Sequence, residues 1–64
     1  MEEYEGYVVI SKGEHSCIGF NPEASKEFVC WLYGYDRECV HSGFYSNDID
    51  EILEKFRDRE CAYL

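Results

Sequence analysis

The chain has 64 residues, of which 14 are Asp or Glu and six are Lys or Arg, giving a formal net charge of −8. This charge excludes direct binding to DNA, RNA or an anionic membrane, because affinity for phosphates comes mainly from Lys and Arg. Hydrophobic residues reach 45% and aromatic residues 17%, a composition typical of a folded chain rather than a disordered acidic tail. We therefore expect one small domain over residues 1–64.

The beginning of the chain is acidic, Met1-Glu2-Glu3-Tyr4-Glu5, whereas a secretory signal begins with basic residues. No apolar run is long enough to span a membrane. We therefore expect a cytoplasmic protein whose four cysteines are reduced thiols.

The first third of the chain predicts a β-hairpin. Residues 4–11 are rich in β-forming residues, and residues 15–20 alternate between two faces. The turn signal Lys12-Gly13-Glu14 lies between them and joins the two strands. After this hairpin, the sequence Asn21-Pro22 opens a turn, and residues 22–26 predict one short helical turn.

Residues 27–35 form the clearest predicted strand and are apolar on both faces. One face carries Phe28, Cys30 and Leu32, and the other carries Val29, Trp31, Tyr33 and Tyr35. Such a strand is normally covered on both sides, here by a helix together with either another layer or a second copy of the protein. A turn at residues 34–36 then leads into a predicted fourth strand, residues 37–41.

A helix is predicted after a loop at residues 42–45. Ser46 or Asn47 can cap it, and its apolar residues have the spacing of one helical stripe: Ile49, Ile52, Leu53 and Phe56, with Tyr63 if the helix persists. The predicted fold class is α+β: a small antiparallel β-sheet of three to four strands with one C-terminal amphipathic helix packed on it, in the order β-β-β-β-α.

Two Cys-His pairs, His15 with Cys17 and Cys39 with His41, could surround a zinc ion if their strands were adjacent. Their spacing argues against this, because structural zinc sites usually begin with two cysteines two to four residues apart. Buried Cys acting as a small hydrophobic residue is the simpler interpretation. No catalytic signature surrounds any cysteine, and the glycines form no phosphate-binding loop. We therefore expect no enzyme activity and no cofactor.

The acidic residues gather at two places: Glu2, Glu3 and Glu5 at the start, and Asp48, Asp50, Glu51, Glu54 and Asp58 along the predicted helix, whose acidic surface also includes Glu60. Carboxylates on successive helical turns lie roughly 5–6 Å apart, which is comparable with the spacing of phosphates on a nucleic-acid strand. A rigid helix of this kind can imitate a phosphate backbone. The alternative is a solvated helix face with internal salt bridges through Lys55, Arg57 and Arg59, whose charge serves solubility.

In size, charge, aromatic content and the order of strands followed by an acidic helix, the chain resembles small phage-encoded acidic inhibitors. That class includes anti-CRISPR proteins, anti-restriction DNA mimics and uracil-DNA glycosylase inhibitors, and the resemblance is greatest to anti-CRISPR proteins. It implies a non-enzymatic inhibitor, in the bacterial host cytosol, that blocks the nucleic-acid site of a basic-surfaced defence protein such as a CRISPR-Cas complex. No shared motif assigns roles to individual residues.

The predicted interface consists of the two acidic groups together with three apolar anchors, Tyr35, Phe44 and Tyr45. Two alternatives remain open. One is a structural or homo-oligomeric module, such as a homodimer, whose acidity serves solubility. The other is a small zinc-stabilised module.

Overall fold

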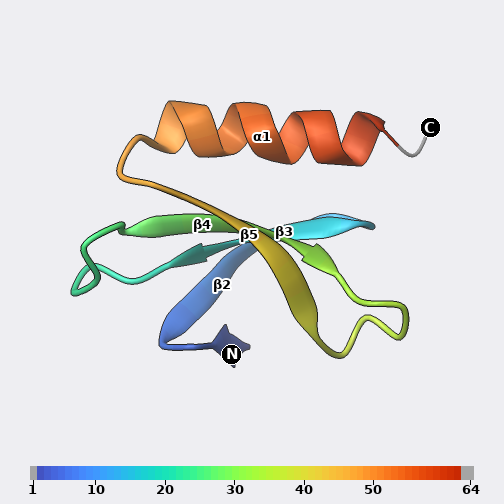
Figure 1. The fold of residues 1–64 in the computed structure, drawn as a ribbon, viewed down its shortest axis with the longest axis horizontal. Helices are drawn as coiled ribbons and strands as arrows, with labels where there is room; N and C mark the ends of the chain where they lie inside the picture. The colour runs from blue at the N-terminus through green and yellow to red at the C-terminus, as the bar shows by residue number, and fades with distance from the viewer. Residues whose placement is uncertain (1, 63–64) are drawn as a thin grey trace.

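The protein forms one antiparallel sheet with a helix on it, as a computed structural model that describes residues 2–62 shows (Figure 1). Five strands lie in chain order across the sheet, followed by the helix: β1 (Glu3–Tyr4), β2 (Tyr7–Lys12), β3 (Ser16–Phe20), β4 (Phe28–Tyr33), β5 (Val40–Ser46) and α1 (Ile49–Cys61). The predicted α+β class and C-terminal helix are confirmed, although the sheet has five strands instead of three to four. Within residues 2–62, no helix has both the length and the apolar character needed to cross a bilayer.

The additional strand arises because the predicted first strand, residues 4–11, is divided by a tight turn. Glu5 and Gly6 have φ values of 52° and 87°. Two consecutive residues with positive φ are typical of the two-residue turns that join antiparallel strands, where Gly is favoured at the second position. Tyr4 consequently pairs with Tyr7, and β1 folds back on β2.

The last strand is displaced from its predicted position, residues 37–41, to residues 40–46. The segment between β4 and β5 is a loop, closed by a 2.8 Å hydrogen bond from the Gly34 N–H to the Cys39 carbonyl. The predicted loop at 42–45 therefore belongs to β5. β5 has a register shift opposite Trp31, where Ser42 has a φ of 55°. Such a bulge interrupts the alternation of side chains between the two faces, so the sequence of β5 lacks a regular strand pattern.

Ser46 and Asn47, the two predicted helix caps, have other roles, and Asp48 caps α1 by accepting a 2.9 Å hydrogen bond from the Asp50 N–H. The Asn47 amide instead fixes the loop before β4, donating to the Ser25 carbonyl and accepting from the Glu27 N–H. That loop is not the helical turn predicted for residues 22–26.

One core cluster lies between α1 and the sheet. Ile18, Cys30 and Ile52 are its buried members, with partly buried aromatic residues around them: Phe28, Phe44 and Phe56. The predicted helix stripe is therefore correct at Ile52 and Phe56. Ile49 and Leu53 are 37% and 49% exposed, whereas three long polar side chains of α1 are partly buried: Lys55, Arg59 and Glu60. Tyr63 lies outside the described residues.

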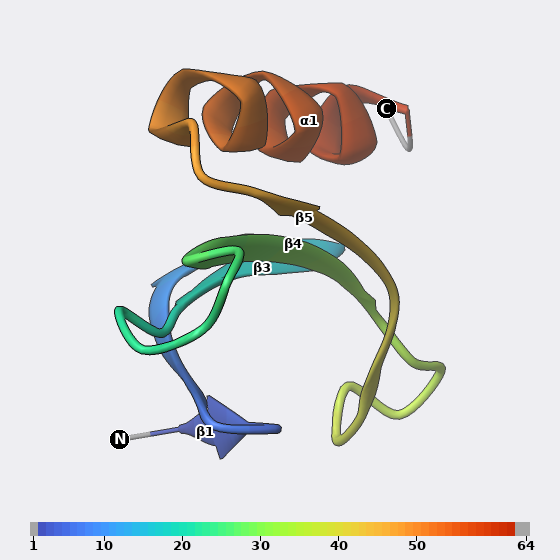
Figure 2. The same cartoon turned by 60° about the vertical axis from the view of Figure 1, so that its left-hand side comes forward.

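The sheet curls away from α1 (Figure 2). Its own side chains therefore cover the face opposite the helix, which we call the inner face. Tyr7, Cys17, Val29 and Trp31 are buried there. The rings of Tyr4 and Tyr7 meet the Trp31 ring edge-to-face, with centroids 5.8 and 5.6 Å away. The strand that is apolar on both faces is thus covered within a single chain, by α1 on one side and by this curl on the other.

Candidate functional site

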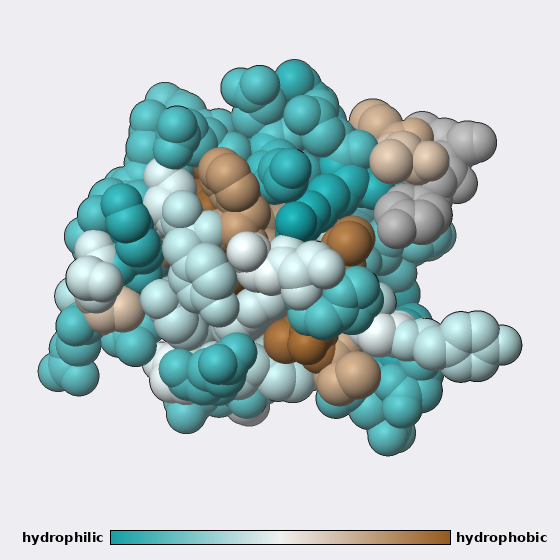
Figure 3. Space-filling model, in the orientation of Figure 1, coloured by the Kyte–Doolittle hydropathy of each residue, from teal (hydrophilic) through white to brown (hydrophobic). Residues whose placement is uncertain are grey.

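The exposed acidic residues of α1 begin at its N-terminal cap. Asp48, Asp50, Glu51, Glu54 and Asp58 are all exposed. Asp50 and Glu51 lie in the first turn, where the helix dipole favours negative charge. On the face seen in Figure 3, hydrophilic side chains gather over the helix, and the apolar areas are small.

Not all of these carboxylates are equally free to bind a partner. Glu51 accepts a 2.6 Å hydrogen bond from the hydroxyl of Ser46, a buried residue whose hydroxyl oxygen in turn accepts from the Asp48 N–H at 3.0 Å. Asp48 is the cap. Asp50, Glu54 and Asp58 therefore carry the helix charge that is least committed to the fold.

A groove of about 280 Å³ runs along the side of α1 next to β5. Four of the predicted interface residues line it together with Lys55: Phe44, Glu51, Glu54 and Asp58. The Lys55 ammonium lies over the Phe44 ring, with its nitrogen 5.3 Å from the ring centroid, a cation–π geometry. Lys55 therefore covers the aromatic surface of the groove, and the three carboxylates leave the lining with a net negative charge that suits Arg or Lys side chains.

The N-terminal acidic residues form a separate patch. Glu2, Glu3 and Glu5 are exposed, but β1 lies at the opposite end of the molecule from α1 (Figure 2). Glu2 forms an ion pair with Lys12 and accepts a hydrogen bond from the Tyr4 hydroxyl, and these contacts lower its pKa below the usual value. The two predicted acidic groups thus do not form one continuous surface.

The three predicted aromatic anchors are also separated. Tyr35 projects fully into solvent from the loop between β4 and β5, and Tyr45 is 42% exposed on the inner face, where its ring lies edge-to-face 6.0 Å from that of Tyr7. Only Phe44 meets the helix carboxylates.

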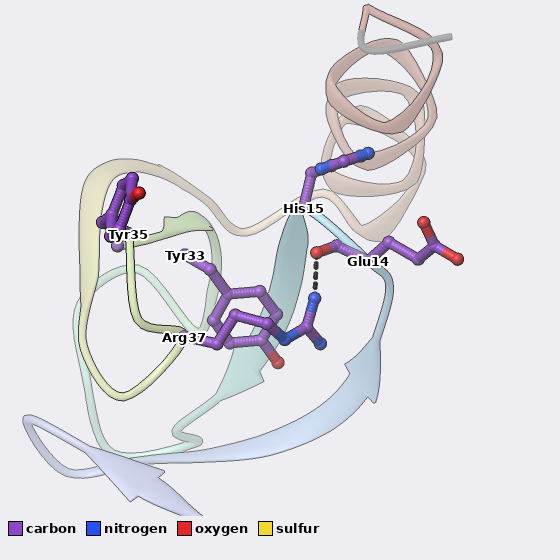
Figure 4. A pocket seen from close by; sticks show the side chains of 6 residues that line it. Glu14, His15, Tyr33, Tyr35 and Arg37 are labelled. Carbon is purple, nitrogen blue, oxygen red and sulfur yellow. Dashed lines mark hydrogen bonds between the residues drawn. The ribbon is translucent and has the colours of Figure 1, made fainter.

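A second hollow, also of about 280 Å³, lies between the β2–β3 turn and the β4–β5 loop (Figure 4). Arg37 stacks on the Tyr33 ring, 4.6 Å from its centroid, and donates hydrogen bonds to the carbonyl oxygens of Gly13 and Glu14. Its guanidinium group therefore joins two turns and is committed to the fold. The buried Tyr33 hydroxyl lies beside Cys17 and has no hydrogen-bond partner within residues 2–62, and burial raises the pKa of Tyr33 to about 12.

The Cys and His residues considered for zinc point to different parts of the fold. Cys17 is buried on the inner face, whereas Cys39 and His41 are exposed around the start of β5. Across residues 2–62, no three His, Cys, Asp or Glu side chains converge in an arrangement that could hold a metal ion. Burial raises the pKa of both Cys17 and Cys30, which favours the neutral thiol.

Arg59 and Glu60, predicted to lie on the charged, solvent-facing side of the helix, instead contact the sheet. Arg59 donates a 2.7 Å hydrogen bond to the Cys30 carbonyl, next to the register shift of β4. The Glu60 carboxylate points toward the β2–β3 turn, where it accepts three hydrogen bonds. The only sequence signal for these roles is their phase, because both residues lie on the same side of the helix as Ile52 and Phe56.

Comparisons of the chain with protein-family models, with curated proteins and with solved structures found no match.

Proposed function

We propose that this protein is a non-enzymatic inhibitor that binds a basic nucleic-acid site on a host defence protein, such as a CRISPR-Cas complex. Its carboxylates on α1 stand in for backbone phosphates. The observation that carries the proposal is the groove beside α1, where Glu51, Glu54 and Asp58 lie next to the exposed part of Phe44.

Electrostatics supports α1 as the contact surface. The formal charge of −8 accelerates encounter with a basic partner, and the groove supplies local contacts for its Lys or Arg side chains. Because the N-terminal patch lies at the opposite end of the molecule, it contributes to the long-range field rather than to the same contact. Binding should therefore weaken as salt concentration rises.

The homo-oligomeric alternative depended on a strand that is apolar on both faces. Val29 and Trp31, on the second face of that strand, are 0% and 2% exposed within one chain. Within residues 2–62, this strand therefore leaves no large apolar face that a second copy would have to cover.

The test measures whether the protein competes with nucleic acid for binding to a panel of guide-loaded CRISPR-Cas complexes and other basic nucleic-acid-binding proteins. The variant Glu54→Lys/Asp58→Lys changes the net charge from −8 to −4, since each reversal adds two units. It spares Glu51, which hydrogen-bonds to Ser46. We expect a loss of affinity on the order of tenfold or more.

A matched control reverses two exposed carboxylates away from the groove, Glu3→Lys/Glu23→Lys, and produces the same net charge. Circular dichroism checks that both variants fold. Equal losses of affinity in the two variants would show that net charge alone, and not the groove, determines binding. Unchanged affinity in the helix variant would show that α1 is not part of the interface.

A further inference from the structure

The outer edge of β5 is open. This strand is the last in the sheet order and pairs with β4 on one side only. Alternate residues of an edge strand direct their N–H and C=O groups away from the sheet, and within residues 2–62 no backbone hydrogen bond is formed on the outer side of β5. His41, Ser42, Gly43 and Tyr45 are exposed along it.

This edge lacks most of the features that normally prevent strand addition. Edge strands are usually short or carry charged residues or Pro, as the other edge does: β1 has two residues, one of them Glu3. In contrast, β5 has seven residues, and positions 39–47 contain no Asp, Glu, Lys, Arg or Pro, although charged residues make up 31% of the chain. The one protective feature of β5 is the irregularity at Ser42.

The acidic groove lies immediately beside this edge, on the helix side of the sheet. Phe44 belongs to β5, and the carboxylates that line the groove with it belong to α1. A strand added to β5 would direct every second side chain toward the helix side. These side chains would come next to Glu51, Glu54 and Asp58.

The charges select the occupant. If a second copy paired antiparallel with β5 about a two-fold axis, both helices would lie on the same face of the joined sheet. Their groove carboxylates would then face each other across the two β5 strands, which is unfavourable. A basic segment places cations there instead, next to three carboxylates, Glu51, Glu54 and Asp58, that outnumber the one cation lining the groove, Lys55.

We propose that the β5 edge binds an extended basic segment of the partner as a sixth strand, with alternate Arg or Lys side chains lying in the groove beside α1. This inference rests on the proposed function and adds the conformation and charge pattern of the bound segment. Backbone pairing supplies part of the affinity, and the alternation of basic residues supplies specificity.

Two capped decapeptides test the proposal. One alternates Arg and Thr and can form a strand. The other alternates Arg and Pro, and it keeps the five charges but lacks half of the backbone donors and is unsuited to pairing. We expect the Arg-Thr peptide to bind at least fivefold more tightly by fluorescence anisotropy, and to slow amide hydrogen exchange in residues 40–46 but not in β1.

The variant Glu54→Gln/Asp58→Asn should weaken binding of the Arg-Thr peptide about 2- to 30-fold, as expected for two partly exposed ion pairs. The control Glu3→Gln/Glu23→Gln has the same net charge and should weaken it less.

Equal binding of both peptides without protection of β5 would overturn strand addition while leaving α1 as an acidic binding surface. Failure of the Arg-Thr peptide to bind at millimolar concentration would overturn it as well. Protection of β5 without peptide, together with a mass of twice 7.6 kDa in sedimentation, would assign the edge to a second copy and also contradict the proposal. If the Arg-Thr peptide binds as expected but the wild-type protein competes with nucleic acid for none of the tested complexes, the proposed function fails and the strand site remains.

Discussion

Glu60→Ala is expected to destabilise the protein by about 2–3 kcal/mol, because Glu60 joins the end of α1 to the β2–β3 turn. Its carboxylate accepts hydrogen bonds from the Glu14 N–H at 2.9 Å, the His15 N–H at 3.0 Å and the Ser16 hydroxyl at 2.5 Å. Ser16 is 0% exposed, so the substitution leaves a buried hydroxyl without this acceptor. That cost alone is about 1–3 kcal/mol, and the two backbone contacts, which are more exposed, add less.

The position of Gly13 provides a second way to disturb the same contact. A Cβ atom at residue 13 would lie 2.5 Å from Cδ of Glu60, well inside contact distance. The carboxylate would have to move and would lose its hydrogen bonds. Gly13→Ala should therefore destabilise the wild type by about 1–2 kcal/mol but cost much less in the Glu60→Ala background, where the obstructing group is absent.

Urea denaturation of the wild type, the two single variants and the double variant measures this coupling. We expect a coupling free energy of about 1 kcal/mol or more. Additive effects, or a Glu60→Ala variant as stable as the wild type, would refute the argument that this contact holds the turn to the helix.

The same contact predicts a dependence of stability on pH. Desolvation acts to raise the pKa of Glu60, but the hydrogen bonds from Ser16, His15 and Glu14 outweigh it and keep the pKa below 4.5, its value in the unfolded chain. A carboxyl group whose pKa is lowered on folding stabilises the protein above its unfolded pKa, and this contribution disappears as pH falls through the folded pKa. The stability difference between the wild type and Glu60→Gln should thus be largest above about pH 5 and shrink below pH 4.5. A difference that stays constant down to pH 2 would contradict this.

Three further outcomes are expected. Gly43→Ala should lower the free energy of unfolding by about 1–3 kcal/mol, because its Cβ would lie 2.8 Å from Nε1 of the buried Trp31, and a stability equal to wild type in urea would contradict the packing. Arg59→Met should cost about 1–2 kcal/mol through loss of the hydrogen bond to the Cys30 carbonyl, measured in the same way. Iodoacetamide should modify two thiols quickly in the native protein and four in urea, and mass spectrometry should find the fast sites at the exposed residues, Cys39 and Cys61, rather than at the buried ones, Cys17 and Cys30.

The sequence predicted those parts of the fold whose local pattern agrees with their surroundings. The alternation along residues 28–33 assigned Val29 and Trp31 to one face and Cys30 to the other, as the two core clusters show. The helix was predicted from its apolar spacing, and its exposed acidic residues followed from the same periodicity. For the candidate site, Glu51, Glu54 and Asp58 were named from their positions on the helix and Phe44 as an aromatic residue of a predicted loop, but the sequence did not show that they line one groove.

Where pairing partners decide the conformation, the sequence was insufficient. Residues 42–45, with Ser and Gly, have weak strand propensity, yet pairing with β4 makes them part of β5. The sequence predicts Glu5 and Gly6 as the interior of a strand. In the structure they form a turn, which places Tyr4 against Trp31.

The sequence by itself determined that this protein is acidic, contains β-strands and ends in an amphipathic helix, because charge and periodicity are local properties of the chain. Only the tertiary structure decided that the two acidic groups lie at opposite ends of the molecule and that the Glu60 carboxylate binds the β2–β3 turn. It also decided that the charge-free strand β5 forms an open edge beside the groove. These features depend on how residues distant in the sequence pack together, which no local pattern specifies.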